Sequence, residues 1–478
     1  MEGKTEEIHM YNLRRKLIGN RAFYAMVMAV VVPIIIQNAI TNFVSLLDNL
    51  MVGSIGTDEM SGVAISNQLM FVFNLAMFGA VSGAGIFTAQ YHGAGNVEGI
   101  RASMRYKLYV GTALTVIAIA LFSIVGKNLI SLYLTDTSDP ERVARTLKFG
   151  MQYLRIMLLG MLPFAAVQCY AGTLREIGET RVPMIAGVIA VLVNLVFNYL
   201  LIFGNFGFPR LGVRGAAYAT ILSRYVEAII VISYTHTHKK RFPFAQGLYS
   251  TLRIPAQVVK EITIKGMPLL VNEFLWSFGQ ATLSQIYSMS GLDVVAAMNI
   301  TSTITNVFSV VYLSMGSAAA IIVGQDLGAN EIETAKDHTW KLQAFSVAIS
   351  LMMAVVLASL SPLIPRLYNT TEAVYALASA FLLVFSINMP AMSFCNCGYF
   401  VMRSGGKTGL TFAFDSGCSW LLCVPVAYVT SQVLGLPVVA VYACVQVVEI
   451  IKACAAMILL RKGVWINNIV SGEYMQMN

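Results

Sequence analysis

Hydrophobic residues along this chain gather into long stretches that are separated by short polar segments. A helix that crosses a membrane needs about 20 predominantly apolar residues. Twelve stretches meet this requirement, at residues 22–49, 60–88, 106–126, 149–172, 183–204, 213–234, 264–289, 294–323, 341–363, 373–401, 408–431 and 436–459. The pattern therefore predicts an all-α membrane protein with twelve transmembrane helices.

The composition agrees with this prediction, since 57% of the 478 residues are hydrophobic and 12% are charged. An ordinary soluble domain carries about 25% charged residues. The charged N-terminal segment precedes a full-length span rather than a short apolar core with a cleavage site, so we do not expect a signal peptide. The connections are too short for a separate soluble domain.

Lys and Arg lie mostly in alternate connections and at both ends of the chain. Basic residues beside membrane spans are retained on the cytoplasmic side. We therefore expect a multi-pass protein of the cell inner membrane with both termini in the cytoplasm. The net charge of +8 is then a topology signal, and nucleic acid is not an expected partner.

The chain also contains an internal repeat with an offset of 235 residues. Pairs at this offset are Pro33 and Pro268, Gly56 and Gly291, Ile65 and Ile300, Gln90 and Gln325, and Gly93 and Gly328. The repeat predicts two pseudo-symmetric six-helix lobes, residues 1–235 (N-lobe) and 264–478 (C-lobe), joined by a cytoplasmic linker at 236–263. Such repeats usually indicate alternating-access transport, although a duplication can also merely enlarge a bundle.

Polar residues within the spans are costly and point to function. Asp48 ends the first span, and Asn38, Thr41 and Ser45 precede it at helical spacing, so all four share one face. Such a face points at protein or water. The alternative is an acid at the outer helix end that meets lipid headgroups.

Asn194 and Asn198 lie one turn apart in the fifth span, and Thr220 lies in the sixth. Together with Asp48 they offer hard oxygen ligands, which suit a proton or a small hard cation. Asn and Thr can equally serve as hydrogen-bonding contacts between helices, and for each residue taken singly this second interpretation is favoured.

Glu273 is the deepest acid, and Trp276 and Gln280 follow on its face. Asn299 and Asn306 form a similar polar face on the next span. Two such faces predict a water-filled cavity in which Glu273 contacts substrate or carries a proton.

Asp415 lies less deep in the eleventh span and could pair with Lys407 near the interface. Two i,i+3 pairs, Arg224 with Glu227 and Glu449 with Lys452, are interpreted as structural ion pairs. Arg155 has no partner that the sequence identifies.

Several enzyme classes are excluded by missing motifs. The segment Gly406-Lys407-Thr408 lacks the earlier Gly of a Walker A loop, because Val401 stands there. The sequence has no HExxH, and its His residues lie outside the spans, so we expect neither an enzyme nor a cofactor. The one metal we consider is Na+ at Asp48.

At this point the motifs resemble those of the multidrug and toxic compound extrusion (MATE) family, over the whole chain. They are Asp48-Asn49-Leu50-Met51-Val52-Gly53 before Gly56, Gln90-x-x-Gly93-Ala94 and Gln325-x-x-Gly328-Ala329, Arg175-x-x-Gly178-x-Thr180-x-x-Pro183, Asn194-x-x-x-Asn198-Tyr199, and Gly212-x-x-Gly215-Ala216-Ala217-x-Ala219-Thr220.

The resemblance implies two lobes around a cleft, and export of cationic or amphipathic organic compounds in exchange for Na+ or H+. It implies that Asp48, Asn194, Asn198 and Thr220 bind the coupling ion. Position 198 is Asp in some branches and Asn here. One branch pairs the acid of span 7 with an Asp in span 10, which has no acid here, so Glu273 and Asp415 are assigned to substrate contact or protonation.

The leading hypothesis is thus a cation-coupled antiporter for a small organic, cationic substrate, working as a monomer within membrane lipid. The alternatives are a lipid-linked oligosaccharide flippase of the same superfamily and a narrow-substrate metabolite exporter. A flippase would favour a strongly cationic cleft, whereas the acids in this chain favour positive substrates.

Overall fold

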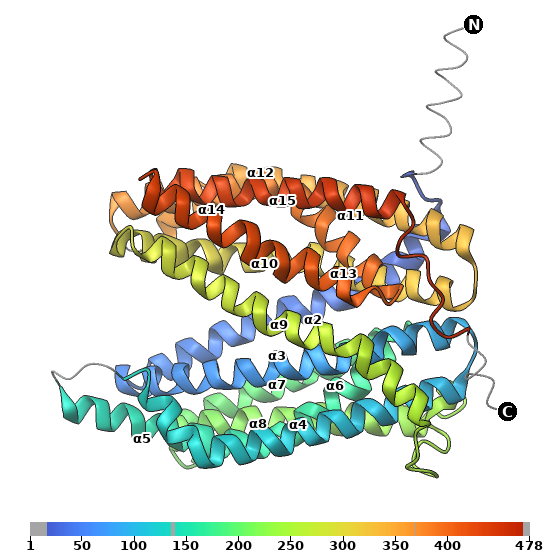
Figure 1. Ribbon diagram of the computed structural model, residues 1–478. Coiled ribbons are helices and arrows are strands. Elements are labelled where there is room, and N and C mark those ends of the chain that lie inside the picture. Colours follow the sequence, from blue (N-terminus) through green and yellow to red (C-terminus); the bar gives the residue numbers. More distant parts are fainter. Residues whose placement is uncertain (1–16, 135–138, 369, 472–478) are drawn as a thin grey trace, which may run out of the picture. The chain divides into compact units, whose positions relative to one another are not determined.

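The computed structural model describes residues 17–134, 139–368 and 370–471, apart from the side chains of Ser45, Leu46 and Asn49. Ser45 of the predicted polar face and Asn49 of the Asp48 motif therefore have side chains outside the described set. In the described residues every regular element is a helix (Figure 1). This confirms the all-α prediction.

The first half of the chain contains α2 (Arg21–Gly53), α3 (Thr57–Gly93), α4 (Val97–Ser131), α5 (Pro140–Met157), α6 (Met161–Glu176), α7 (Arg181–Phe203) and α8 (Val213–Thr237). The second half contains α9 (Ala256–Ser288), α10 (Leu292–Gly328), α11 (Ile332–Leu360), α12 (Glu372–Ser404), α13 (Thr408–Phe412), α14 (Val424–Tyr428) and α15 (Val438–Arg461).

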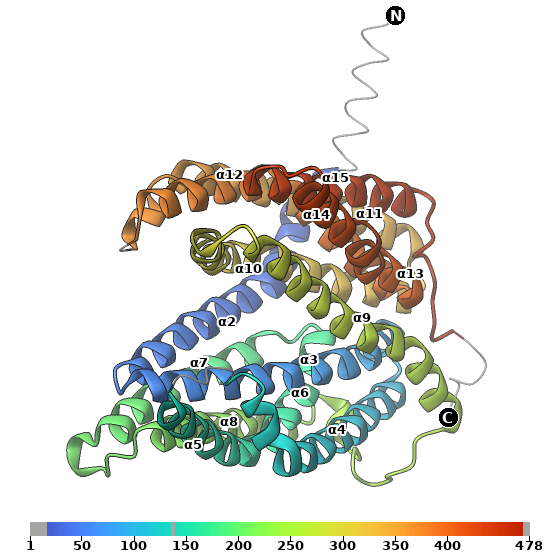
Figure 2. The ribbon, with the colours of Figure 1, turned by 60° about the vertical axis from the view of Figure 1, so that its left-hand side comes forward.

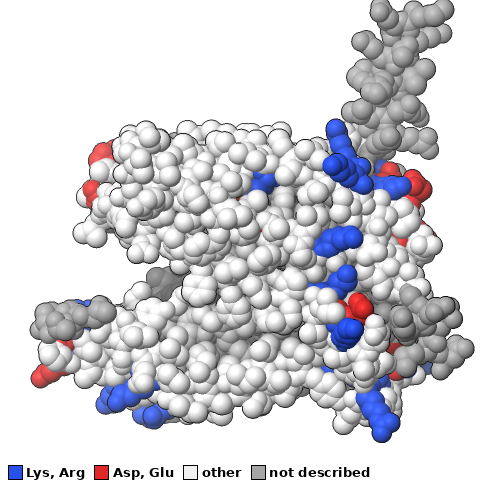
Figure 3. Space-filling model, viewed as in Figure 1, with Lys and Arg blue, Asp and Glu red and all other residues white. Residues whose placement is uncertain are grey.

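Among the described residues, eleven helices are long and apolar enough to cross a membrane, with α5 and α6 counted as one. The 33-residue α9 stands where the seventh span is predicted. It is not among these eleven helices, because Asn272, Glu273 and Gln280 lower its mean hydropathy. The chain is a multi-pass membrane protein, and most of the surface shown in Figure 3 is uncharged.

Two predicted spans are less regular than expected. The predicted span 149–172 falls across α5 and α6, which a short 3-10 turn at Leu158–Gly160 separates. The predicted span 408–431 contains π-helical turns at Ala413–Gly417, Ser419–Cys423 and Val429–Val433 between α13 and α15. Such turns often occur at functional sites, and one of them carries Asp415.

Helix bounds repeat with the offset found in the sequence. Helices α2 and α9 both have 33 residues, and each bound of α9 lies 235 positions after that of α2. Helices α3 and α10 both have 37 residues and the same offset. Pro33 and Pro268 occupy the same place within α2 and α9. The duplication is therefore structural as well as sequential.

The chain divides into two compact units. Unit 1 comprises Met1–Ile35, Ala89–Asn96 and Met267–Asn478, and unit 2 comprises Ile36–Thr88 and Val97–Gly266. Helices α2, α3 and α9 each contribute residues to both units, whereas the predicted lobes were divided at the linker.

Each unit has its own apolar packing. In unit 1, α12 packs against α10, α11 and α15 (Figures 1 and 2). In unit 2, α8 packs against α5, α6 and α7. A cluster that includes Val52, Tyr153 and Ile202 joins α2, α5 and α7, and it lies beside the candidate site described below.

Small residues allow two helix ends to cross closely in unit 1. A Cβ on Gly93 would lie 1.9 Å from the carbonyl oxygen of Gln325, and a Cβ on Gly328 would lie 1.9 Å from that of Gln90. Small residues at helix crossings let backbones approach in this way. The matched pairs of the sequence repeat thus meet each other.

We expect Gly93→Ala to destabilise the protein by about 1–3 kcal/mol, because the added methyl group forces the crossing apart. Gly409→Ala is the control, since its Cβ would meet nothing within 4 Å. Thermal unfolding of the two purified variants measures the difference. Equal melting temperatures would show that the two helix ends can move apart without loss of stability.

Candidate cation site

Asp48 lies near the C-terminal end of α2, in unit 2, and meets α7. The Asn198 Nδ2 donates to its Oδ1 at 2.5 Å. The Asn194 amide, one turn earlier, places its Nδ2 2.8 Å from the same oxygen in the orientation that satisfies its neighbours. Because the i,i+4 spacing puts both amides on one face of α7, the two side chains converge on the carboxylate.

Thr220 completes this cluster from α8. Its hydroxyl oxygen lies 3.3 Å from the Asn194 amide and 3.0 Å from the carbonyl oxygen of Ala216. The structure therefore brings together Asp48, Asn194, Asn198 and Thr220 from three helices. This grouping meets the requirement for a ligand cluster, and its hydrogen bonds are at the same time contacts between helices.

Burial distinguishes the amides from the carboxylate. Asn194 is 5% exposed and Asn198 is 1% exposed, whereas Asp48 is only half-buried. The Oδ1 of Asn198 is buried and accepts no hydrogen bond within the described part of the chain. A buried acceptor without a donor is destabilising, and a hard cation or a protonated group beside it would satisfy it.

The polar face that precedes Asp48 lines a cavity, and its residues Asn38 and Thr41 are exposed. Asn38, Thr41 and Asp48 line a cavity of about 350 Å³ in unit 2, together with Asn194 and Thr220. This placement favours a site over an acid among lipid headgroups. The spacing of polar residues in the first span predicted that Asn38, Thr41 and Asp48 share one face.

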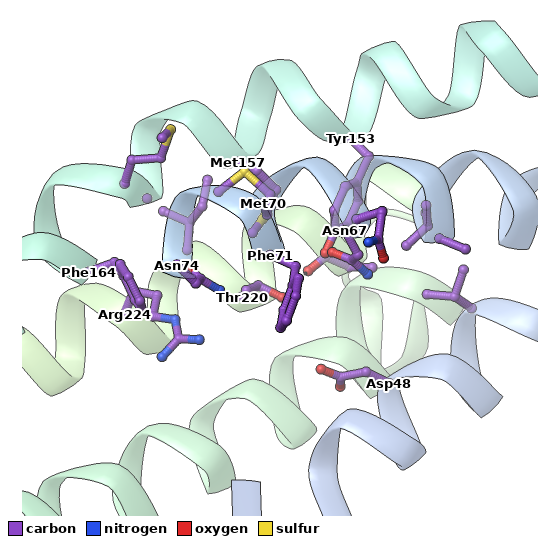
Figure 4. Close-up of a pocket in the computed structure, with 18 of the residues that line it drawn as sticks. Asp48, Asn67, Met70, Phe71, Asn74, Tyr153, Met157, Phe164, Thr220 and Arg224 are labelled. Atoms are coloured by element: carbon purple, nitrogen blue, oxygen red, sulfur yellow. Dashed lines mark hydrogen bonds between the residues drawn. The ribbon is translucent and has the colours of Figure 1, made fainter. Parts of the chain in front are cut away.

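A second cavity of about 490 Å³ in unit 2 shares Asp48, Asn198 and Thr220. Figure 4 shows Asp48 on α2 at one side of this cavity and Arg224 on α8 at the other, with Phe71 between them in the view. The remaining walls combine amide, aromatic and thioether groups, contributed by Asn67, Asn74, Tyr153, Phe164, Met70 and Met157.

Sequence reasoning missed most of this wall. Asn67 and Asn74 are seven residues apart in α3 and thus share a helical face, which is a signal that could have identified them. Arg224 was interpreted as half of a structural ion pair with Glu227. The pair exists, with 3.4 Å between Nη1 and Oε2, but Arg224 also lines both cavities.

In unit 1, Asp415 belongs to a separate polar cluster. The Asn272 Nδ2 donates to its Oδ2 at 3.0 Å, and Lys452 Nζ lies 4.0 Å from its Oδ1. Lys452 also pairs with Glu449 at 2.9 Å, as the spacing predicts. The pairing of Asp415 with Lys407 is wrong, because Lys452 of α15 is the base that approaches Asp415.

The residues predicted to surround Glu273 make fewer contacts with one another than those around Asp48. Glu273 is partly buried beside Asn272, and the charges of Arg403 and Asp415 act on it. The side chains of Trp276, Gln280, Asn299 and Asn306 are exposed, and within the described residues no hydrogen bond joins them to Glu273. The structure thus brings Glu273 near Asp415 but does not assemble the other four around it.

The residues present fit a proton or a small hard cation better than a transition metal. No group of three or more His, Cys, Asp or Glu is placed to hold a metal ion in the described ranges. The carboxylate of Asp48, the amide oxygens of α7 and the Thr220 hydroxyl are hard donors, the class that Na+ prefers over soft metals.

Comparison with known proteins gives a consistent result. The MatE family model matches residues 33–200 and 268–429. The chain is 28% identical to the "Probable multidrug resistance protein NorM" of Thermotoga maritima over 336 residues, which cover 70% of this chain and 69% of that protein. It is 24% identical to the "Probable multidrug resistance protein YoeA" of Bacillus subtilis, covering 86% of this chain and 88% of that one.

Solved structures share the fold. A MATE crystal structure in the bent conformation superposes with a TM-score of 0.83 at 18% identity, covering 92% of this chain and 95% of that chain. A variant of the Vibrio cholerae MATE transporter VcmN also gives 0.83 at 18% identity, with coverages of 93% and 97%.

Proposed function

The chain belongs to the MatE family of membrane transporters, and we propose that it exports cationic or amphipathic organic compounds in exchange for Na+ or H+ bound at Asp48. Its relatives are named as multidrug resistance proteins, which supports efflux of organic compounds. The family and the fold carry the transporter assignment, and the geometry at Asp48 supports the coupling.

One observation carries the coupling proposal. The amides of Asn198 and Asn194 hold Asp48, and Asn198, which lines the same cavity, has a buried Oδ1 with no donor in the described structure. A cation or proton bound to Asp48 would neutralise the carboxylate, and a cation that also reached the Asn198 Oδ1 would satisfy that oxygen. Binding would therefore change the charge of the cavity in a single step.

This change of charge couples the binding of the ion to the release of the substrate. A ligand shifts a conformational equilibrium only by its different affinity for the two states. With Asp48 neutral, the cavity loses its attraction for a positively charged substrate, so the ion and the substrate favour alternate occupancy. We further propose that the protein lies in the cell inner membrane with both termini on the cytoplasmic side. We also propose that it works as a monomer.

The test of export is ethidium retention in cells that express the protein. We expect expressing cells to retain less ethidium than vector controls, and an ionophore that collapses the ion gradients to remove the difference. Unchanged retention would move the assignment to a narrow-substrate exporter or to a lipid-linked oligosaccharide flippase.

Thr220→Val is expected to raise the concentration of coupling ion needed for half-maximal export by about 2- to 10-fold, the range for one lost neutral hydrogen bond or ligand. Thr235→Val is the matched control, because Thr235 is a buried Thr of the same helix that bonds only back to Val231 among the described contacts, at 2.7 Å. Equal shifts in both variants would indicate a general effect on α8 rather than an ion ligand.

A further inference from the structure

Arg155 of α5 has no role in the proposed exchange, and the sequence identified no partner for it. It stands directly before a run of uncharged residues, 156–174, that continues through most of α6. Its side chain is exposed, and within the described part of the chain no hydrogen bond, ion pair or ring contact holds it. An unpaired Arg at the edge of an apolar membrane segment is costly unless its guanidinium reaches water or a lipid headgroup.

Lys148 adds positive charge near Arg155. The two residues are seven positions apart in α5 and therefore share one face of the helix, and both are exposed. The acid within α5 is Glu141, and its Oε2 lies 3.6 Å from the Nη1 of Arg145. This face of α5 thus presents two positive charges that no acid of the same helix neutralises.

An apolar groove lies between α4, α6 and α8 in unit 2. It has a volume of about 580 Å³, and α6 packs against both of the other helices. Of its lining residues, Ala165 and Ala228 are buried, whereas Leu162, Tyr225 and Ile229 are exposed. No lining residue is charged, and none of them lines the two cavities at Asp48. A groove of this kind on membrane-spanning helices suits an acyl chain, because it offers water few hydrogen bonds.

The turn between α5 and α6 connects Arg155 to this groove. Tyr225, which lines the groove, donates its hydroxyl to the carbonyl oxygen of Leu159 at 3.2 Å. Helices α5 and α6 count as one membrane span, in which Leu159 and Leu162 follow Arg155 by four and seven residues. The three side chains therefore lie on one face. At 1.5 Å per residue, Leu162 lies about 10 Å from Arg155 along the span.

We propose that Arg155 and this groove form a binding site for an anionic phospholipid. The phosphate contacts Arg155, and one acyl chain lies in the groove between α4, α6 and α8. Arg matches a phosphate through two parallel hydrogen bonds, and basic residues at grooves between membrane helices bind anionic headgroups in this way. A zwitterionic lipid fills the same groove with weaker affinity, because Arg155 and Lys148 repel its positive group.

The competing interpretation is that Arg155 is an ordinary interfacial residue and that the groove holds any neighbouring lipid. The two interpretations differ in the effect of headgroup charge. A built site retains an anionic lipid in preference to a zwitterionic lipid with the same chains, and that preference depends on Arg155. An ordinary interfacial residue gives no such preference.

The test is native mass spectrometry of the purified protein in detergent, titrated with phosphatidylglycerol or with phosphatidylcholine of the same acyl chains. We expect wild type to retain phosphatidylglycerol more tightly. Arg155→Gln should weaken that binding by about fivefold, the effect of one basic residue beside an anionic lipid, and leave phosphatidylcholine unchanged. Arg155→Lys keeps the charge and should retain most of the preference. The control is Arg210→Gln, which removes an exposed Arg from the connection between α7 and α8.

Ala166→Phe tests the groove separately from the charge. Ala166 is a half-buried residue of the groove, so the added ring occupies the space of the acyl chain while Arg155 stays in place. We expect this variant to lose retention of both lipids. Ala120→Phe is its control, because it adds the same bulk to an exposed position of α4 outside the groove. Size-exclusion profiles establish that each variant is folded.

Equal retention of the two lipids by wild type overturns the inference, as does wild-type retention of phosphatidylglycerol by Arg155→Gln. Equal losses in Arg155→Gln and Arg210→Gln also overturn it, because the preference then follows the net charge of the protein. Unchanged retention in Ala166→Phe removes the acyl chain from the groove and with it the proposed site. None of these measurements involves transport, so each outcome leaves the proposed export function intact.

Discussion

Asp48→Asn is expected to reduce gradient-driven ethidium export to the level of vector controls while the protein remains folded. The substitution keeps the size of the side chain and its position beside Asn198, but it removes the negative charge that attracts the coupling ion. Hydrogen bonds and contacts to charged groups contribute about 1.5–3 kcal/mol, so ion affinity should fall by about 10- to 150-fold.

Asp58→Asn is the matched control for this loss. Asp58 also lies in unit 2, but it pairs with Arg142 and Arg145 at the start of α3. Ethidium retention in cells and size-exclusion profiles of both variants separate transport from folding. Normal export by Asp48→Asn would remove Asp48 from the coupling step.

Lys107→Met should be the most destabilising single change in unit 2. The Lys107 side chain is 0% exposed, pairs with Glu176 of α6 and donates to Thr173 at 3.0 Å. Removing one partner of a buried ion pair costs about 3–5 kcal/mol, because the other charge is left in a medium that solvates it poorly. We expect a large fall in melting temperature and in the yield of folded protein.

Two further variants test the reason for that loss. Lys336→Met removes an exposed Lys that pairs with Glu333, and its effect should stay within about 0.5 kcal/mol. Adding Glu176→Gln to Lys107→Met should recover part of the stability, since the Glu176 carboxylate is then no longer left without the Lys107 ammonium. A double variant less stable than Lys107→Met alone would contradict this electrostatic explanation.

The sequence predicted the membrane helices and the repeat because both depend on local composition and on a fixed offset. The bounds of α2 and α9, and of α3 and α10, keep the offset of 235 residues. The cluster at Asp48 was also within reach, because polar spacing in single helices shows which side chains share a face. The family resemblance then related those faces to one another.

Contacts between distant helices were not predictable in the same way. Lys452 approaches Asp415 from α15, and the sequence offered the nearer Lys407 instead. Arg224 has a partner at i+3 that explains its charge locally, so its exposure to the cavity gave no sequence signal. The π-helical turns around Asp415 were likewise not predicted from the sequence.

The most direct test of the coupling at Asp48 is transport by purified protein in liposomes with the Na+ and pH gradients imposed separately. We predict that one of the two gradients drives ethidium uphill in wild type, and that neither gradient does so in Asp48→Asn. Uphill transport by Asp48→Asn, or uphill transport by wild type with both gradients absent, would contradict it.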